Sequence, residues 1–106
     1  MFDHEKLDVY HVRFEFVTWS YRLCETLEGA DRPARDQLLR ASPSIPLNRA
    51  EGNGKLPSAD REGYLRIALG SALECAATLD VLAGCGAIGD ETARTGKGLL
   101  VRIVSM

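Results

Sequence analysis

Residues 58–86 read SADREGYLRIALGSALECAATLDVLAGCG, and this stretch decides the fold class. Its apolar residues recur at steps of three and four, whereas a β-strand would need alternation at every second position. This spacing predicts one amphipathic helix. We expect Ser58 to cap its start and the glycines on either side of Cys85 to end it. The predicted buried stripe consists of Leu65, Ala68, Ala72, Cys75, Leu79 and Leu82.

A second stripe with the same periodicity lies near the start of the chain. It predicts a first helix over about residues 4–28, with Asp3 or a neighbour as its cap. Gly29 follows the last turn and is expected to end the helix. The residues predicted to face the core are Leu7, Tyr10, Phe14, Val17, Tyr21 and Cys24.

The second helix along the chain is predicted to begin near Asp31 and Pro33, because an acid followed by an early proline is typical of helix starts. Pro43 and Pro46 lie inside it, and each removes a backbone donor, so we expect a kink or a short break within one helix. The turn residues of segment 52–57 predict a loop before Ser58. The residues expected to be buried are Leu38, Ala41 and Ile45.

The last helix is predicted to begin with Asp90 as its cap. Gly96 and Gly98 each cost it up to about 1 kcal/mol relative to alanine, and its expected apolar anchors are Leu99, Leu100, Ile103 and Val104. Four amphipathic helices joined by short loops predict a single all-α domain over residues 1–106. The expected architecture is an up-down four-helix bundle.

Composition narrows the class of protein. The chain of 106 residues has 45% hydrophobic residues and a net charge of −2, which is typical of a globular domain and not of a disordered one. Its three cysteines (Cys24, Cys75 and Cys85) are odd in number and lack CxxC spacing, so neither a disulfide nor a zinc framework is indicated. We expect only Cys85 to be accessible. No secretory signal and no run of about 20 apolar residues is evident, so a soluble, cytoplasmic protein without a membrane partner is predicted.

Two strings carry a resemblance to a known family. Residues 37–52 read Gln-Leu-x-Arg-Ala-Ser-x-Ser-Ile-Pro-x-Asn-x-Ala-Glu-Gly, and residues 67–74 read Ile-Ala-x-Gly-Ser-Ala-x-Glu. With Leu-Asp-Val-Tyr at residues 7–10, they resemble the bacterial four-helix-bundle family associated with intervening sequences of 23S ribosomal RNA genes. The resemblance covers nearly the whole chain. It implies a homopentameric ring or barrel, and it supplies no enzymatic activity, because none is established for the family as a whole. A related group is similar to accessory proteins of diversity-generating retroelements, which partner a reverse transcriptase and bind nucleic acid through a basic surface.

The resemblance also maps a motif, made mostly of polar residues, onto the second and third predicted helices along the chain. Two interpretations apply: the motif fixes helix register or subunit contacts, or it binds a ligand. We favour the structural one, in which Asn48 and Glu51 satisfy backbone groups freed by Pro46. Arg49 and Pro43 depart from the family pattern. The motif residues are Arg40, Ser44, Asn48, Glu51, Gly70, Ser71 and Glu74, and Gln37 accompanies them.

Sites for catalysis are weakly indicated. His4, Asp8, His11 and Glu15 share one face of the first helix and could bind a transition metal, but no ligands from a facing helix are evident, so a solvated face is the favoured interpretation. The loop Gly52-x-Gly54-Lys55 lacks the spacing of a phosphate-binding loop. No Ser-His-Asp or Cys-His arrangement follows from spacing. We therefore predict a protein that is no enzyme and holds neither metal nor cofactor.

Three functions compete. The favoured one is an oligomeric scaffold that associates with RNA or an RNA-handling protein; small residues on the helix after Ser58, and a second apolar strip (Phe16, Trp19 and Leu23), exceed what one bundle is expected to bury. Residues 1–31 carry a net charge of −4 and residues 32–66 a net charge of +3. The alternatives are a protein-interaction module with no nucleic-acid role and a metal-dependent enzyme that uses His4 and His11. The expected RNA contacts are Arg32, Arg35, Arg61 and Arg66.

Overall fold

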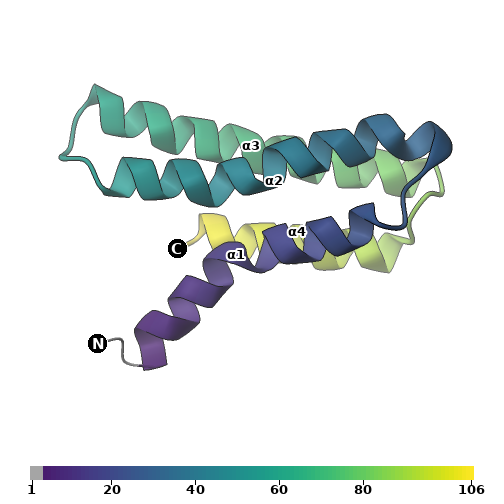
Figure 1. The fold of residues 1–106 in the computed structure, drawn as a ribbon, viewed down its shortest axis with the longest axis horizontal. Coiled ribbons are helices and arrows are strands. Elements are labelled where there is room, and N and C mark those ends of the chain that lie inside the picture. Colours follow the sequence, from purple (N-terminus) through teal and green to yellow (C-terminus); the bar gives the residue numbers. More distant parts are fainter. Residues whose placement is uncertain (1–3) are drawn as a thin grey trace.

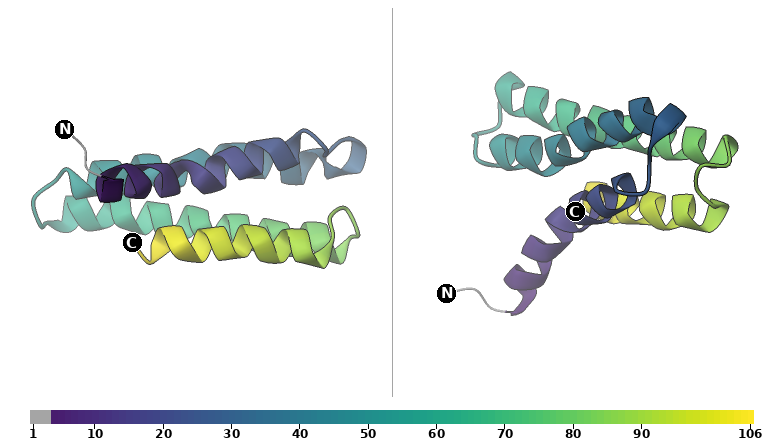
Figure 2. Two further views of the ribbon diagram at one scale, coloured as in Figure 1. Left: turned by 90° about the horizontal axis from the view of Figure 1, so that it is seen from below. Right: turned by 45° about the vertical axis from the view of Figure 1, so that its right-hand side comes forward.

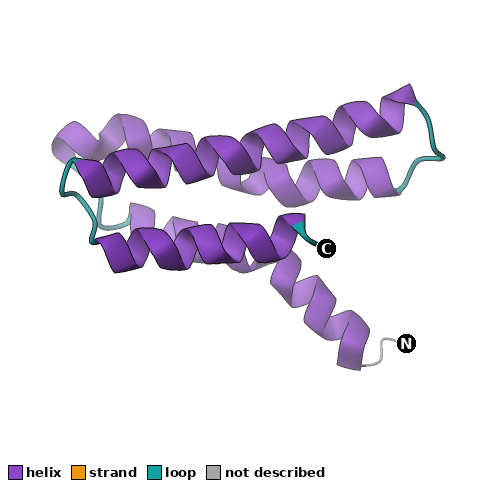
Figure 3. Ribbon diagram, turned by 180° about the vertical axis from the view of Figure 1, so that it is seen from behind, coloured by secondary structure: helices purple, strands orange, loops and turns teal. Residues whose placement is uncertain are grey.

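The computed structural model describes the backbone of residues 4–106 and the side chains from His11 onward (Figure 1). Four α-helices follow one another in this part of the chain: α1 (His4–Cys24), α2 (Arg32–Asn53), α3 (Ala59–Gly84) and α4 (Asp90–Val104). Successive helices run in opposite directions (Figures 1 and 3). The predicted all-α class and up-down helix order are therefore confirmed.

The helices pack as two layers. α2 and α3 form the more extensive pair, and α1 and α4 lie beside each other against them (Figure 2). Each helix contacts the two that are next to it around the bundle, so one core forms along the middle. Its fully buried members include Phe16, Leu38, Ile45, Cys75, Leu79 and Ile103.

The predicted buried face of α1 is only partly correct: Cys24 is buried and Val17 half-buried, but the two aromatic residues of that face are not in the core. Phe14 and Tyr21 are 36% and 45% exposed, whereas Phe16 is fully buried and stacks on Trp19 at a centroid distance of 5.7 Å. The strip that was expected to exceed the capacity of the bundle, Phe16, Trp19 and Leu23, therefore belongs to the core and its margin. The side chains of Leu7 and Tyr10 lie outside the described residues.

Helix ends agree with the turn signals in most places. α1 ends at Cys24 rather than near residue 28, and Gly29 adopts a positive φ of 59° in the short 3-10 turn that follows. At the start of α3, the Ser58 hydroxyl accepts a hydrogen bond from the Arg61 N–H at 3.1 Å, as predicted. The predicted caps differ: Asp31 forms no side-chain cap hydrogen bond, and Gly89 rather than Asp90 occupies the cap position of α4. The suggested cap Asp3 lies outside the described residues.

α2 is one helix from Arg32 to Asn53, so Pro43 and Pro46 do not divide it. The predicted anchors of α4 are partly correct, because Leu100 and Ile103 are buried while Val104 is 37% exposed. The Cα radius of gyration is 14.6 Å, above the roughly 13 Å expected for a compact domain of this length. Part of the excess comes from the start of α1, which turns away from the other helices (Figure 1).

α3 is the most apolar feature of the described chain by the hydropathy criterion for membrane spans. It is long and apolar enough to cross a membrane by length and composition, although core helices of soluble proteins meet the same criterion. The sequence of α3 has no uninterrupted apolar run of that length, and the helix meets the criterion only through its mean hydropathy. In its most apolar 18-residue window 33% is buried, and four large apolar side chains of α3, Ile67, Leu69, Leu73 and Val81, are at least half exposed.

Candidate functional site

A hydroxyl–amide cluster joins α2 to α3 in the middle of the bundle. The Ser44 hydroxyl accepts hydrogen bonds from Asn48 Nδ2 and from Ser71 Oγ, each at 2.9 Å. Asn48 Nδ2 also donates to the Ser44 carbonyl at 2.8 Å. The carbonyl that Pro46 leaves without a helical partner is that of Ser42, four residues before it. Asn48 bonds to the Ser44 carbonyl and not to this one, so the prediction that Asn48 satisfies the group freed by Pro46 is wrong. The hydrogen bond from Ser71 to Ser44 thus links the two helices at this level.

A second polar cluster lies one to two turns away on the same pair of helices. The Glu74 carboxylate accepts hydrogen bonds from Gln37 Nε2 and from the Arg40 guanidinium, which also donates to Gln37 Oε1 at 3.0 Å. The Arg40 side chain is 64% exposed and that of Glu74 is 34% exposed. Water and salt screen such a pair, so its net contribution is under about 1 kcal/mol. It aligns the helices more than it stabilises them.

Two residues of the predicted motif stand apart from both clusters. Glu51 is exposed and forms no hydrogen bond or ion pair with any residue that the structure describes. Gly70 is exposed on α3, and a Cβ added there would meet no atom within 4 Å. A glycine inside a helix costs about 1 kcal/mol relative to alanine, and nothing within the subunit requires it at this position.

Gly70 belongs to an apolar strip that runs along the outside of α3. Ile67, Leu73 and Val81 are 53%, 63% and 58% exposed. Their spacing places them on one side of the helix, about a third of its circumference, away from the buried stripe. We call this strip the outer α3 face; its members are Ile67, Gly70, Leu73, Ala77 and Val81, all exposed.

The four arginines predicted to contact RNA are divided between the two ends of the molecule. Arg32 and Arg35 lie in the first turn of α2, whereas Arg61 and Arg66 lie near the start of the antiparallel α3. Arg35 is paired with Asp36 at 3.1 Å, and Arg61 donates to the Lys55 carbonyl at 3.3 Å. α2 is about 33 Å long at 1.5 Å per residue, so one subunit does not bring the four together.

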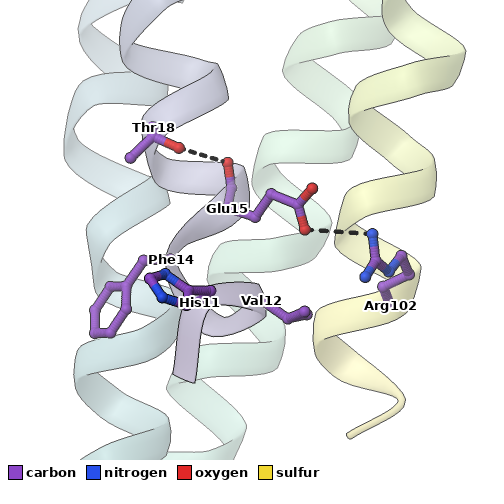
Figure 4. A pocket seen from close by; sticks show the side chains of 6 residues that line it. All are labelled: His11, Val12, Phe14, Glu15, Thr18 and Arg102. Atoms are coloured by element: carbon purple, nitrogen blue, oxygen red, sulfur yellow. Dashed lines mark hydrogen bonds and ion pairs between the residues drawn. The ribbon is translucent and has the colours of Figure 1, made fainter. Parts of the chain in front are cut away.

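Two members of the predicted metal stripe, His11 and Glu15, line an open pocket of about 580 Å³ between α1 and α4 (Figure 4). The Glu15 carboxylate there pairs with Arg102 at 3.3 Å across the two helices. Among the side chains that the structure describes, no three His, Cys, Asp or Glu residues are grouped to hold a metal ion. The side chains of His4 and Asp8 lie outside that part.

The three cysteines differ in accessibility as predicted. Cys24 and Cys75 are buried and Cys85 is exposed, all as free thiols. Burial raises the pKa of Cys24, and it raises the pKa of Cys75 to about 12, with the nearby Glu74 charge acting in the same direction. A thiol that stays protonated is a poor nucleophile. The two core cysteines are thus packing residues.

The fold is a small all-α bundle, and both polar clusters described above link α2 to α3. The model of a protein family described as 23S rRNA-intervening sequence protein matches residues 5–106. The chain belongs to this family. Comparisons with curated proteins and with solved structures give no match.

The sequence indicated the residues of the polar motif, but not that they form two separate clusters with Glu51 and Gly70 outside both. The i, i+4 spacing of Ser44 and Asn48 was a sufficient signal for one cluster. The open space beside Gly70 and the packing of Trp19 on Gly96 had no local signal, because both depend on which helices are neighbours.

Proposed function

We propose that this protein is a non-enzymatic, cytoplasmic scaffold that assembles with copies of itself through the outer α3 face. The observation that carries the proposal is the exposure of Ile67, Leu73 and Val81 along one side of a helix. Soluble monomers rarely leave a continuous apolar strip in water. Gly70 and Ala77 lie between the larger side chains, and small residues let a second helix approach closely.

A second copy is the favoured occupant because the chain carries complementary charges. Residues 1–31 have a net charge of −4, whereas residues 32–66 have a net charge of +3. Helix α1 itself has as many basic as acidic residues, and the excess negative charge of residues 1–31 lies mainly after it, at Glu25, Glu28 and Asp31. Copies that bring this acidic segment of one subunit toward residues 32–66 of the next would gain electrostatic attraction. Such head-to-tail contacts use two different surfaces and generate rings when the rotation closes. The family resemblance implies five subunits in such a ring.

Sedimentation equilibrium tests the proposal. Leu73→Glu and Val81→Glu place a charge within the outer α3 face and should weaken self-association at least about a hundredfold. Leu56→Glu is the matched control, since Leu56 is 85% exposed in the loop before α3, away from that face. A wild-type chain that sediments only as an 11.6 kDa species at micromolar concentration would sink the proposal.

Association with RNA is a second candidate, favoured by the net charge of +3 on residues 32–66. Four basic residues of this segment, Arg49, Lys55, Arg61 and Arg66, lie around the α2–α3 loop together with the acids Glu51, Asp60 and Glu62, and Lys55 pairs with Asp60 at 3.4 Å. One subunit offers few phosphate contacts, but several copies in a ring could bind with avidity. Charge reversal at Arg61 and Arg66 should abolish retention of RNA in low-salt filter binding, whereas reversal of Arg22 on α1 should not. If the wild-type protein retains no RNA, the RNA proposal fails and a protein partner is the remaining candidate.

A further inference from the structure

The start of α1 leaves the bundle as a helical arm. α1 is continuous from His4 to Cys24, yet its first turns diverge from α2 and α4 (Figures 1 and 2). We call residues 4–13 the arm. By register, Leu7 and Tyr10 continue the stripe of Phe14, which is 36% exposed. The arm therefore carries an apolar face and extends beyond the helices of its own subunit.

Two adjoining clefts open where the arm departs. One, of about 140 Å³, is lined by Phe14, Pro46 and Ile103 among others, and the other, of about 250 Å³, by residues that include Ile45, Leu65 and Leu69. Arg49 and Asn53 line both clefts. We call them together the end groove. Its floor reaches the core, since Ile45 and Ile103 are almost fully buried.

Arg49 gives this groove a charge without a partner. Its side chain is half-buried and forms no ion pair or hydrogen bond with any residue whose side chain the structure describes. Partly buried charges gain most from an opposite charge brought against them. The arm has two carboxylates, Glu5 and Asp8, and two basic residues, Lys6 and Arg13; Arg13 lies at the base of the arm and itself lines the smaller cleft. Arm and groove thus match in apolar character, and the carboxylates near the start of the arm, Glu5 and Asp8, offer Arg49 a partner of opposite charge.

We propose that the end groove of each subunit receives the N-terminal arm of a second copy. The proposal rests on the self-association proposed above, which holds copies close together. A helical arm of ten residues spans about 15 Å, enough to reach from one subunit to the next. The segment has neither glycine nor proline to serve as a hinge, so an arm that points away from its own groove is placed to occupy another.

Disulfide cross-linking tests which arm occupies the groove. Leu7→Cys and Ala50→Cys are introduced in separate chains of different mass, both with Cys85→Ser, and the chains are mixed and oxidised. A covalent heterodimer is expected, because Ala50 lines the groove. Leu7→Cys mixed with Leu56→Cys, a loop position, is the control. A double variant that cross-links only within one chain would overturn the proposal in favour of closure by the subunit's own arm.

Charge exchange provides the second measurement. Arg49→Glu should weaken self-association about tenfold, and combining it with Glu5→Lys and Asp8→Lys should restore most of the loss. The two proposals fail in different ways. If the wild-type chain is monomeric, both fail. If it assembles and responds to Leu73→Glu, but shows neither the heterodimer nor an effect of Arg49→Glu, only the arm proposal fails.

Discussion

Gly96 and Gly98 look alike in the sequence but occupy opposite environments. A Cβ added to Gly96 would come within 2.4 Å of the Trp19 ring and 2.8 Å of Leu79, whereas one added to Gly98 would meet nothing within 4 Å. Gly96→Ala should therefore lower the free energy of unfolding by about 1–3 kcal/mol through overpacking. Gly98→Ala should raise it by up to about 1 kcal/mol through helix propensity. Urea denaturation followed by Trp19 fluorescence measures both; equal effects would contradict this difference.

Substitutions of Asn48 and of Glu51 should have different effects on the free energy of unfolding. Asn48→Leu removes the donor to Ser44 in a partly buried cluster and should cost about 1–3 kcal/mol of unfolding free energy. Glu51→Leu should change it by less than about 0.5 kcal/mol, since Glu51 is exposed and unpartnered among the described residues. Thermal melts of both variants decide it. His4→Ala and His11→Ala serve as comparisons expected to be nearly silent, and a large loss from either would revive the metal hypothesis.

Thiol chemistry should distinguish the cysteines. At pH 8 a disulfide reagent is expected to label Cys85 alone, because Cys24 and Cys75 are buried and have raised pKa values. A raised pKa in the folded state favours folding below the unfolded thiol value near 9, and this stabilisation is lost as the pH rises toward about 12. Counting labelled thiols with and without denaturant is the measurement. Three labelled thiols in the native chain would contradict the packing.

At the scale of the helix, α2 contains a correctable cost. Pro43 removes a backbone hydrogen bond inside a continuous helix, so Pro43→Ala should raise the unfolding free energy by about 1–3 kcal/mol. Pro33→Ala is the matched control, because Pro33 lies in the first turn of α2, where proline is tolerated. Chemical denaturation of the two variants compares them. No gain at position 43, or an equal gain at 33, would mean that Pro43 fits its site without strain.

The helices also show what sequence can predict. α3 has one strongly buried stripe, and that stripe was predicted residue by residue; Leu65, the half-buried member, is the partial exception. α1 has two apolar stripes, and choosing between them requires the neighbouring helices, which put Phe16 in the core and leave Phe14 at its edge. The same limit applies to the candidate site, because the outer α3 face becomes visible only when packing shows which apolar residues stay in water.

At the scale of the whole molecule, stability should depend on protein concentration. The bundle leaves Ile67, Leu73 and Val81 of α3 more than half exposed, so an isolated subunit leaves apolar surface in water that assembly would cover. Only folded subunits can assemble, so assembly stabilises the folded state by mass action. Raising the protein concentration a hundredfold then adds up to about 2.7 kcal/mol to the free energy of unfolding. For a domain of about 100 residues this corresponds to a rise in Tm on the order of 10 °C.

Differential scanning fluorimetry at about 1 and about 100 µM measures this rise. Leu73→Glu should leave the Tm at the low concentration nearly unchanged, because Leu73 is 63% exposed in the subunit and surface substitutions usually cost less than about 0.5 kcal/mol. The same variant should lose the dependence on concentration, while Leu56→Glu should keep it. A wild-type Tm that is identical at both concentrations would show that the outer α3 face contributes nothing to stability through self-association, and the folded subunit would then be the complete cooperative unit.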